Sequence, residues 1–203
     1  MKPKVTVYSD YICPFCFIGK DRVERLEKEF DVDVEWKGFE IHPETPEKGS
    51  TIEEMGFNKD YIKMAQTNVT RLAAESGLEI KSLNKLSNSR LALEISEYAK
   101  DKGKFKEFYE AIFRAYWVDG EDIGDRKFLL KTAESSGMDI EEIKKYIDSG
   151  KGQERLEEVL LETKKLGITG VPTFIIGDKM IVGAQPYEVI KKAVEEEIRL
   201  TNE

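Results

Sequence analysis

The two cysteines of this chain stand three positions apart in the sequence Cys13-Pro14-Phe15-Cys16, and the chain has no others. Residues 5–8 before them form a short apolar run typical of a strand, and residues 17–30 after them repeat apolar side chains at helical spacing. The motif is therefore predicted to join a strand to a helix. A C-x-x-C at such a junction indicates redox chemistry and restricts the chain to folds that open with a strand and a helix.

The two sulfurs are expected to have different roles. Pro14 suits the first helical position, because its φ is already helical and its missing N–H would have no partner there. Cys13 is then the N-cap, where its sulfur would face the free N–H groups of Phe15 and Cys16 and the positive end of the helix dipole, which favour thiolate. We predict that Cys13 is the nucleophile and that Cys16, on the apolar side of the helix, is the buried resolving thiol.

A structural metal site is the main alternative explanation of a C-x-x-C pair. Such sites need four ligands, whereas this sequence has no third cysteine and a single histidine, His42. We therefore expect no metal and no bound cofactor. His42 is followed by Pro43 and is expected only to end a strand.

Composition limits the partners of this chain. Its 203 residues are 40% hydrophobic, which suits one domain or one domain with a large insertion. The net charge of -8 argues against nucleic acid or an anionic membrane as the main partner. The N-terminus lacks the features of a signal peptide and no apolar run could span a bilayer, so a cytoplasmic protein is expected.

The rest of the chain predicts two kinds of structure. Residues 32–41 read as a second strand, parallel to the first, which completes a β-α-β unit. Residues 58–166 read as helix upon helix, and the aromatic stripe over 105–117 is expected to be core. Glycines are expected to stop the helices of this block, at Gly77, Gly103, Gly137, Gly150 and Gly167.

Strand signals return near the C-terminus, where residues 173–176 and 180–182 read as a hairpin and a helix follows from Pro186. This order predicts an α/β, thioredoxin-like fold with a large all-helical insertion. The thioredoxin-like domain would comprise residues 1–55 and 165–203, and the helical insertion residues 56–164.

A second motif precedes the returning strand. Val171-Pro172 resembles the cis-proline loop that faces the C-x-x-C in thioredoxin-like proteins. A cis X-Pro bond would expose the backbone of Val171 toward a groove where an extended peptide can pair with it. Val171, Pro172, Pro14 and Phe15 are therefore the predicted substrate-binding residues.

Several segments in order carry a resemblance to a known family that extends over nearly the whole chain. The chain is similar to the DsbA family in its FrnE-like branch, which is related to 2-hydroxychromene-2-carboxylate isomerase and kappa-class glutathione transferase. The matching segments are SDYICPFCFIG at 9–19, NSRLA at 88–92, DIGD at 122–125, GITGVPTF at 167–174 and GAQ at 183–185.

Departures from the relatives qualify what the resemblance implies. DsbA-type sites often have histidine between the cysteines, so Phe15 predicts a couple less oxidising than that of DsbA. The isomerase and transferase relatives typically carry a lone serine or cysteine at the first motif position and an acidic residue near the last strand. This chain has both cysteines, and Gln185 near the last strand.

Three functions follow from the sequence. The first is a thiol-disulfide oxidoreductase that exchanges disulfides with protein or peptide thiols and is recycled by an unknown redox partner. The second is a glutathione-dependent isomerase or transferase acting on a small aromatic substrate, with glutathione as co-substrate. The third is a peptide-binding protein or chaperone whose disulfide is incidental.

Two carboxylates near the motif leave alternatives open. Asp10, three residues before Cys13, either tunes the nucleophile or hydrogen-bonds its own turn. Glu40, in the second predicted strand, is either an exposed strand residue or a proton acceptor for Cys16.

Overall fold

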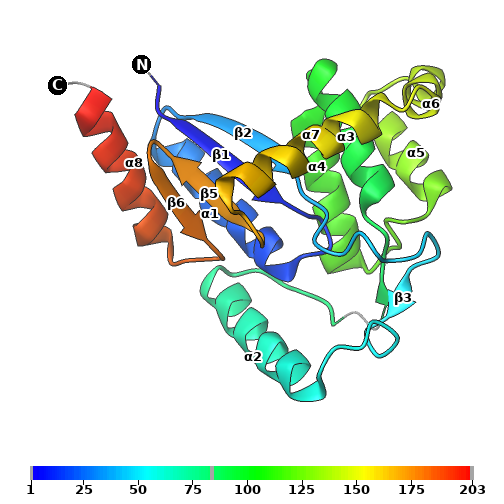
Figure 1. Ribbon diagram of the computed structural model, residues 1–203, viewed down its shortest axis with the longest axis horizontal. Coiled ribbons are helices and arrows are strands. Elements are labelled where there is room, and N and C mark those ends of the chain that lie inside the picture. The colour runs from blue at the N-terminus through cyan, green and yellow to red at the C-terminus, as the bar shows by residue number, and fades with distance from the viewer. Residues whose placement is uncertain (1, 83–84, 202–203) are drawn as a thin grey trace.

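A computed structural model describes residues 2–82 and 85–201 and shows a four-stranded mixed sheet (Figure 1). Its strand order is β2-β1-β5-β6, with β1 at Lys4–Ser9, β2 at Asp33–Gly38, β5 at Thr173–Ile176 and β6 at Lys179–Val182. β1 and β2 are parallel, as predicted, and the other neighbours are antiparallel. The sequence expectation of a thioredoxin-like α/β fold is confirmed.

Helices cover both faces of this sheet. On one face α1 (Pro14–Glu29) and α8 (Tyr187–Thr201) share a core with the strands. Across the other face runs α7 (Lys151–Leu166), whose Glu162 accepts a hydrogen bond from the Tyr8 hydroxyl at 2.8 Å. The apolar core beneath α1 and α8 contains Val5, Val7, Val23, Leu26, Phe174, Ile176, Ile190 and Val194.

A block of helices extends the molecule beyond the sheet (Figure 1). After α2 (Lys59–Glu75), it consists of α3 (Arg90–Asp101), α4 (Phe105–Arg114), a π-helical turn η1 (Ala115–Asp119), α5 (Arg126–Ser135) and α6 (Ile140–Asp148), followed by α7. The aromatic stripe of residues 105–117 forms its core, as predicted, although the helix changes to the π turn after Arg114. The same core cluster includes both cysteines, so the helical block and the C-x-x-C motif are packed as one unit.

The helices of this block end where the glycines indicate. Five α-helices end one or two residues before a glycine whose φ lies between 64° and 85°. This left-handed conformation closes a helix and is inexpensive only for glycine. The five are α2, α3, α5, α6 and α7, followed by Gly77, Gly103, Gly137, Gly150 and Gly167.

The structure corrects two predictions, one about the second strand and one about the helical insertion. The second strand ends at Gly38 rather than Ile41, because Gly38 pairs with Ser9 and β1 ends there. The predicted helical insertion is not wholly helical, since β4 (Lys85–Leu86) pairs with β3 (Ser50–Thr51). A strand of two residues is too short to show the alternation of apolar and polar side chains that predicts strands from a sequence. Within the described residues, no helix is long and apolar enough to cross a membrane.

Candidate active site

Cys13 occupies the N-cap of α1, and Pro14 is the first helical residue. The backbone of Cys13 is extended, and its carbonyl accepts the N–H groups of Cys16 at 3.0 Å and Phe17 at 3.3 Å. The predicted contact between the Cys13 sulfur and the helix N–H groups is wrong, because the side chain makes no capping hydrogen bond. The carbonyl already uses the Cys16 N–H, and the sulfur turns toward the opposite wall of the site.

That opposite wall is the loop before β5. The Cys13 thiol donates to the Val171 carbonyl at 3.5 Å, and the Val171–Pro172 peptide bond is cis. Val171 is partly exposed and Pro172 is buried. A Cβ at Gly19 would lie 3.2 Å from the Pro172 ring, so glycine allows α1 to approach this loop closely. Two segments 158 residues apart thus meet at the reactive sulfur.

The second sulfur lies inside the protein. Cys16 is 1% exposed, against 7% for Cys13, and both are free thiols. Burial raises the pKa of the Cys16 thiol well above its usual value, and the neighbouring Cys13 raises it further, while the backbone of Asp10 and the hydroxyl of Ser9 lower it. Cys16 is therefore a protonated thiol in an apolar surrounding until a reaction step removes its proton.

Asp10 joins two loops at the carboxyl ends of β1 and β2. Its fully buried carboxylate accepts the Ile41 N–H at 2.8 Å and the Ile12 N–H at 3.4 Å, and it also accepts a hydrogen bond from Ser89. Burial raises the pKa of Asp10 to about 6, although these hydrogen bonds oppose the shift. The bond to Ile12 belongs to its own turn, and the bond to Ile41 fixes the chain where β2 has ended. An effect of Asp10 on the reactivity of Cys13 stays a prediction.

The helical block anchors the loop that leads into the motif. The Trp117 indole N–H donates to the Tyr11 carbonyl at 2.8 Å, and the Tyr11 hydroxyl lies 2.6 Å from the Ser96 hydroxyl oxygen. These partners are 106 and 85 residues away from Tyr11, and sequence reasoning missed both. Trp117 carried only a core signal, as part of the aromatic stripe. No local signal in the sequence could have marked Ser96.

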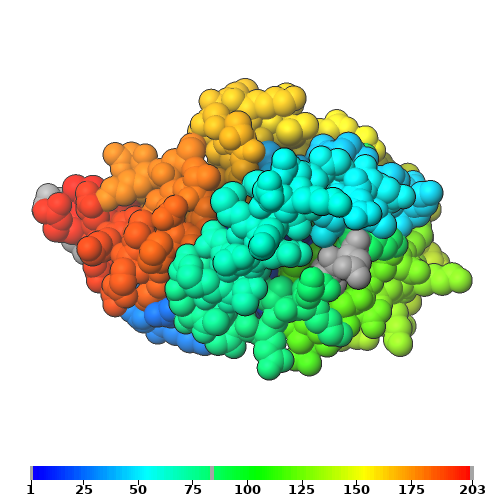
Figure 2. All heavy atoms as spheres, turned by 90° about the horizontal axis from the view of Figure 1, so that it is seen from below, coloured from blue at the N-terminus to red at the C-terminus, as the bar shows by residue number. Residues whose placement is uncertain are grey.

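Phe15 connects the motif to α2. The partly buried Phe15 packs against a small apolar cluster formed by Ile18 of α1 with Val69 and Leu72 of α2. In the space-filling view from this side, α2 lies across the face between the orange C-terminal strands and the green helices (Figure 2). The cover over the C-x-x-C motif therefore comes from the helical insertion, through a contact of few side chains.

Three further residues raised by the sequence lie elsewhere. Glu40 lies in the loop beyond the end of β2. Its carboxylate forms an ion pair with Arg90 at 3.1 Å. His42 does not end the strand, which stops four residues earlier, and its ring contacts Glu44 at 3.0 Å and Phe57. The Gln185 amide donates to the Val182 carbonyl at 2.9 Å.

Comparisons with known proteins place this fold and motif in a family. Residues 4–195 match the family model described as a DSBA-like thioredoxin domain. The chain is 36% identical to the uncharacterized protein YwbO of Bacillus subtilis over 200 residues, which are 97% of this chain and 98% of YwbO.

Solved structures agree with that match. The crystal structure of a probable DsbA oxidoreductase from Streptomyces coelicolor has a TM-score of 0.84 and 25% identity, covering 96% of this chain and 89% of that one. A 2-hydroxychromene-2-carboxylate isomerase structure has a TM-score of 0.80 and 20% identity, covering 98% of each chain, which shows a shared fold. The resemblance drawn from the sequence motifs is confirmed, and the chain belongs to the family of DSBA-like thioredoxin domain proteins.

Proposed function

We propose that this protein is a thiol-disulfide oxidoreductase that exchanges disulfides with protein or peptide thiols through Cys13 and Cys16. One observation carries the proposal: Cys13 stands at a helix N-terminus against the backbone of Val171, while Cys16 is buried directly behind it. The outer sulfur keeps some exposure to solvent, and burial raises the pKa of the inner thiol.

In the oxidising direction, the Cys13–Cys16 disulfide is the starting form. A substrate thiolate attacks the Cys13 sulfur, and Cys16 leaves with the electron pair of the broken S–S bond. The second substrate thiol then attacks the mixed disulfide and releases Cys13. In the reducing direction, Cys13 attacks a substrate disulfide and Cys16 resolves the mixed disulfide.

The loop opposite Cys13 is the proposed substrate platform. The partly exposed Val171 would pair its backbone with an extended peptide, as strands pair at the edge of a sheet. Pro14 and Phe15 lie between the two cysteines and Pro172 follows Val171, and these three residues complete the surface in the proposal. A second redox protein or a small thiol such as glutathione would return the cysteines to their starting state.

The test uses both single-cysteine variants. Cys16→Ser should accumulate mixed disulfides through Cys13, because the resolving thiol is missing. Cys13→Ser should lose turnover in insulin reduction and in the refolding of a reduced disulfide protein. Normal turnover by Cys13→Ser would contradict the proposed exchange function. Absence of exchange by the unmodified protein in both assays would contradict it as well.

A second candidate is a glutathione-dependent isomerase or transferase acting on a small aromatic substrate. Its support is the fold shared with 2-hydroxychromene-2-carboxylate isomerase and the small exposed fraction of Cys13, which suits a small co-substrate. Measuring glutathione-dependent isomerisation and disulfide reduction in one preparation separates the two. Turnover of the aromatic substrate without any disulfide exchange would favour the isomerase.

A further inference from the structure

An open cleft follows the free edge of β2, the outermost strand of the sheet. It has a volume of about 550 Å³ and lies between β2, α7 and the turn that joins α3 to α4. Residues 33–37 of β2 all line it. Because successive side chains of a strand point to opposite faces of its sheet, a space that touches all five follows the edge of the strand. Neither cysteine lines this cleft, so it is separate from the C-x-x-C site.

The backbone of β2 offers hydrogen-bonding groups along this edge. Asp33 at the start of the strand and Phe39 just past its end donate their N–H groups to the carbonyls of residues 3 and 9, at 2.9 and 3.0 Å. The odd-numbered residues of β2 therefore face β1. In a parallel pair the residues between them turn their N–H and C=O groups the other way. Val34 and Trp36 thus face the cleft, and such a free edge is a template for another strand.

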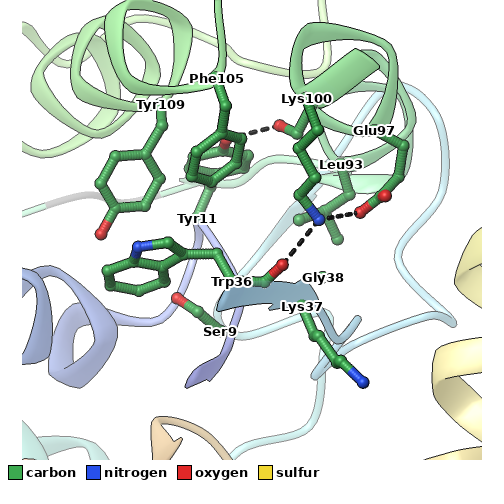
Figure 3. A pocket seen from close by; sticks show the side chains of 11 residues that line it. Ser9, Tyr11, Trp36, Lys37, Gly38, Leu93, Glu97, Lys100, Phe105 and Tyr109 are labelled. Atoms are coloured by element: carbon green, nitrogen blue, oxygen red, sulfur yellow. Dashed lines mark hydrogen bonds and ion pairs between the residues drawn. The ribbon is translucent and has the colours of Figure 1, made fainter. Parts of the chain in front are cut away.

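One of these outward backbone groups already has a partner. The Lys100 ammonium reaches from α3 and donates to the Trp36 carbonyl at 2.6 Å (Figure 3). Within residues 2–82 and 85–201, no hydrogen bond engages the Trp36 N–H or either backbone group of Val34. Three backbone groups are therefore available to an extended chain that lies in the cleft.

The two faces of β2 differ in character at this edge. The side chains of Val34 and Trp36 pack against the apolar core beneath α1 and α8. The odd-numbered side chains point to the opposite face, where Lys37 forms an ion pair with Glu162 of α7 at 2.6 Å. A strand added beside β2 would therefore place its alternate side chains on an apolar face and on a charged face.

The unpaired charge of the cleft is negative. Asp33 of β2 and Glu158 of α7 line the cleft, are exposed, and form no ion pair with any described residue. The cations that line the cleft all have partners within the chain. These pairs are Lys4 with Glu35, Lys37 with Glu162, Lys100 with Glu97 and Arg155 with Asp101. The two free carboxylates favour an occupant with basic side chains.

We propose that this cleft binds an extended basic segment of a partner protein, which adds as a strand beside β2. The segment pairs its backbone with Val34 and Trp36, as in other cases of strand addition. Its lysine or arginine side chains point toward α7 and bind Asp33 and Glu158, and its alternate apolar side chains point the other way. The volume of the cleft lies in the range of ligand sites in proteins. This binding does not depend on disulfide exchange.

A blocked hexapeptide of alternating lysine and valine, labelled with fluorescein, tests the cleft in the unmodified protein. It contains no cysteine, so disulfide exchange does not contribute to the signal. Fluorescence anisotropy should show saturable binding. Asp33→Lys together with Glu158→Lys should weaken this binding by roughly tenfold, because two attractions of the size of exposed ion pairs become repulsions. The double variant should instead prefer a peptide of alternating glutamate and valine.

The matched control is Glu154→Lys together with Glu157→Lys. Both glutamates are exposed on α7 and do not line the cleft, so this variant changes the net charge equally and should bind the lysine peptide normally. Absence of saturable binding, or an equal loss in the two double variants, would overturn the proposal.

Methylated peptides test whether the occupant pairs as a strand. N-methylation of every lysine or of every valine removes alternate N–H groups, and only one of these sets can face β2. One methylated peptide should therefore bind much more weakly than the other, and full binding of both would overturn strand addition. Dimerisation that Asp33→Lys with Glu158→Lys abolishes, without any peptide binding, would assign the cleft to a second copy of the chain and overturn the proposal.

Discussion

The two sides of the cysteine pair are packed to different degrees, although helices of the insertion cover both sides. On the front side, α2 covers the motif with Val69, Leu72 and Ala73 as its only buried residues among 17. On the back side, α4 buries four of its 10 residues in the aromatic core around Cys16. The front of the motif therefore contacts a weakly attached cover through Phe15 and Ile18, whereas the inner sulfur lies in a dense surrounding.

This difference matches the two roles assigned to the sulfurs. A nucleophile that meets large substrates must be uncovered at low cost in free energy, and Tyr61 and Met64 of α2 already expose most of their surface to solvent. A resolving thiol must keep a defined distance from the nucleophile. Dense packing keeps this distance fixed, because side chains in a close-packed core have few alternative positions.

The largest effect is expected from damage to the back side. Phe113 is buried and contacts Tyr11 at 4.9 Å and Tyr109 at 5.0 Å between ring centroids. Phe113→Ala should lower the free energy of unfolding by about 3–5 kcal/mol, as expected for truncating a buried aromatic side chain. Urea denaturation measures this change. A loss below 1 kcal/mol would mean that the back side is not densely packed.

A pH-dependent effect is expected from Asp10. Its pKa of about 6 in the folded protein exceeds the usual value near 3.8, so folding favours the protonated carboxyl. The stability that this contributes is complete below pH 4 and is lost as pH rises through 6. Relative to Asp10→Asn, the unmodified protein should therefore lose roughly 2–3 kcal/mol of unfolding free energy between pH 4 and 7. Urea denaturation across this range should show the difference; a difference that is independent of pH would contradict the assignment.

A smaller effect on stability is expected from the front side. Leu72→Ala removes part of the three-residue cluster that holds α2 against Ile18, and should cost about 2 kcal/mol, at the low end for a buried leucine. Because the cover is loosened, bulky alkylating reagents should reach Cys13 faster in this variant. Rates with a small and a bulky reagent measure the effect. Equal acceleration for both reagents would show that α2 does not restrict access by size.

The smallest effect concerns the redox couple. Phe15 lies between the cysteines and has no charge, so we expect a potential more reducing than the value of about −120 mV known for DsbA. Phe15→His would place a cation beside the outer thiolate and should make the couple more oxidising by roughly 30 mV, about tenfold in the exchange constant. Titration in glutathione buffers measures the redox potentials of the unmodified protein and of Phe15→His. An unmodified couple as oxidising as DsbA would contradict this expectation.

Local signals predicted the parts of the site that depend on neighbouring residues. The strand, Pro14 and the helical spacing placed Cys13 at an N-cap, and Gly167 marked the end of α7. Contacts between distant segments had no such signal. The hydrogen bonds of Tyr11 with Trp117 and Ser96 depend on how the helical block packs, which periodicity alone does not specify.

The orientation of the Cys13 sulfur also depends on a contact between distant segments, which the local sequence does not predict. The N-cap position was predicted, but the sulfur contacts the Val171 carbonyl rather than the helix N–H groups. That choice depends on a loop that is far away in the sequence. Similarly, Ile41 was expected in a strand, and its N–H is instead held by the carboxylate of Asp10.

Alkylation of the two single-cysteine variants with iodoacetamide tests the division of roles most directly. In folded Cys16→Ser at neutral pH, Cys13 should react roughly a hundredfold faster than Cys16 does in folded Cys13→Ser, because only the outer sulfur combines some exposure with a helix N-terminus. In urea the two variants should react at similar rates. Equal rates in the folded variants, or faster modification of Cys16, would contradict the assignment of Cys13 as nucleophile and Cys16 as resolving thiol.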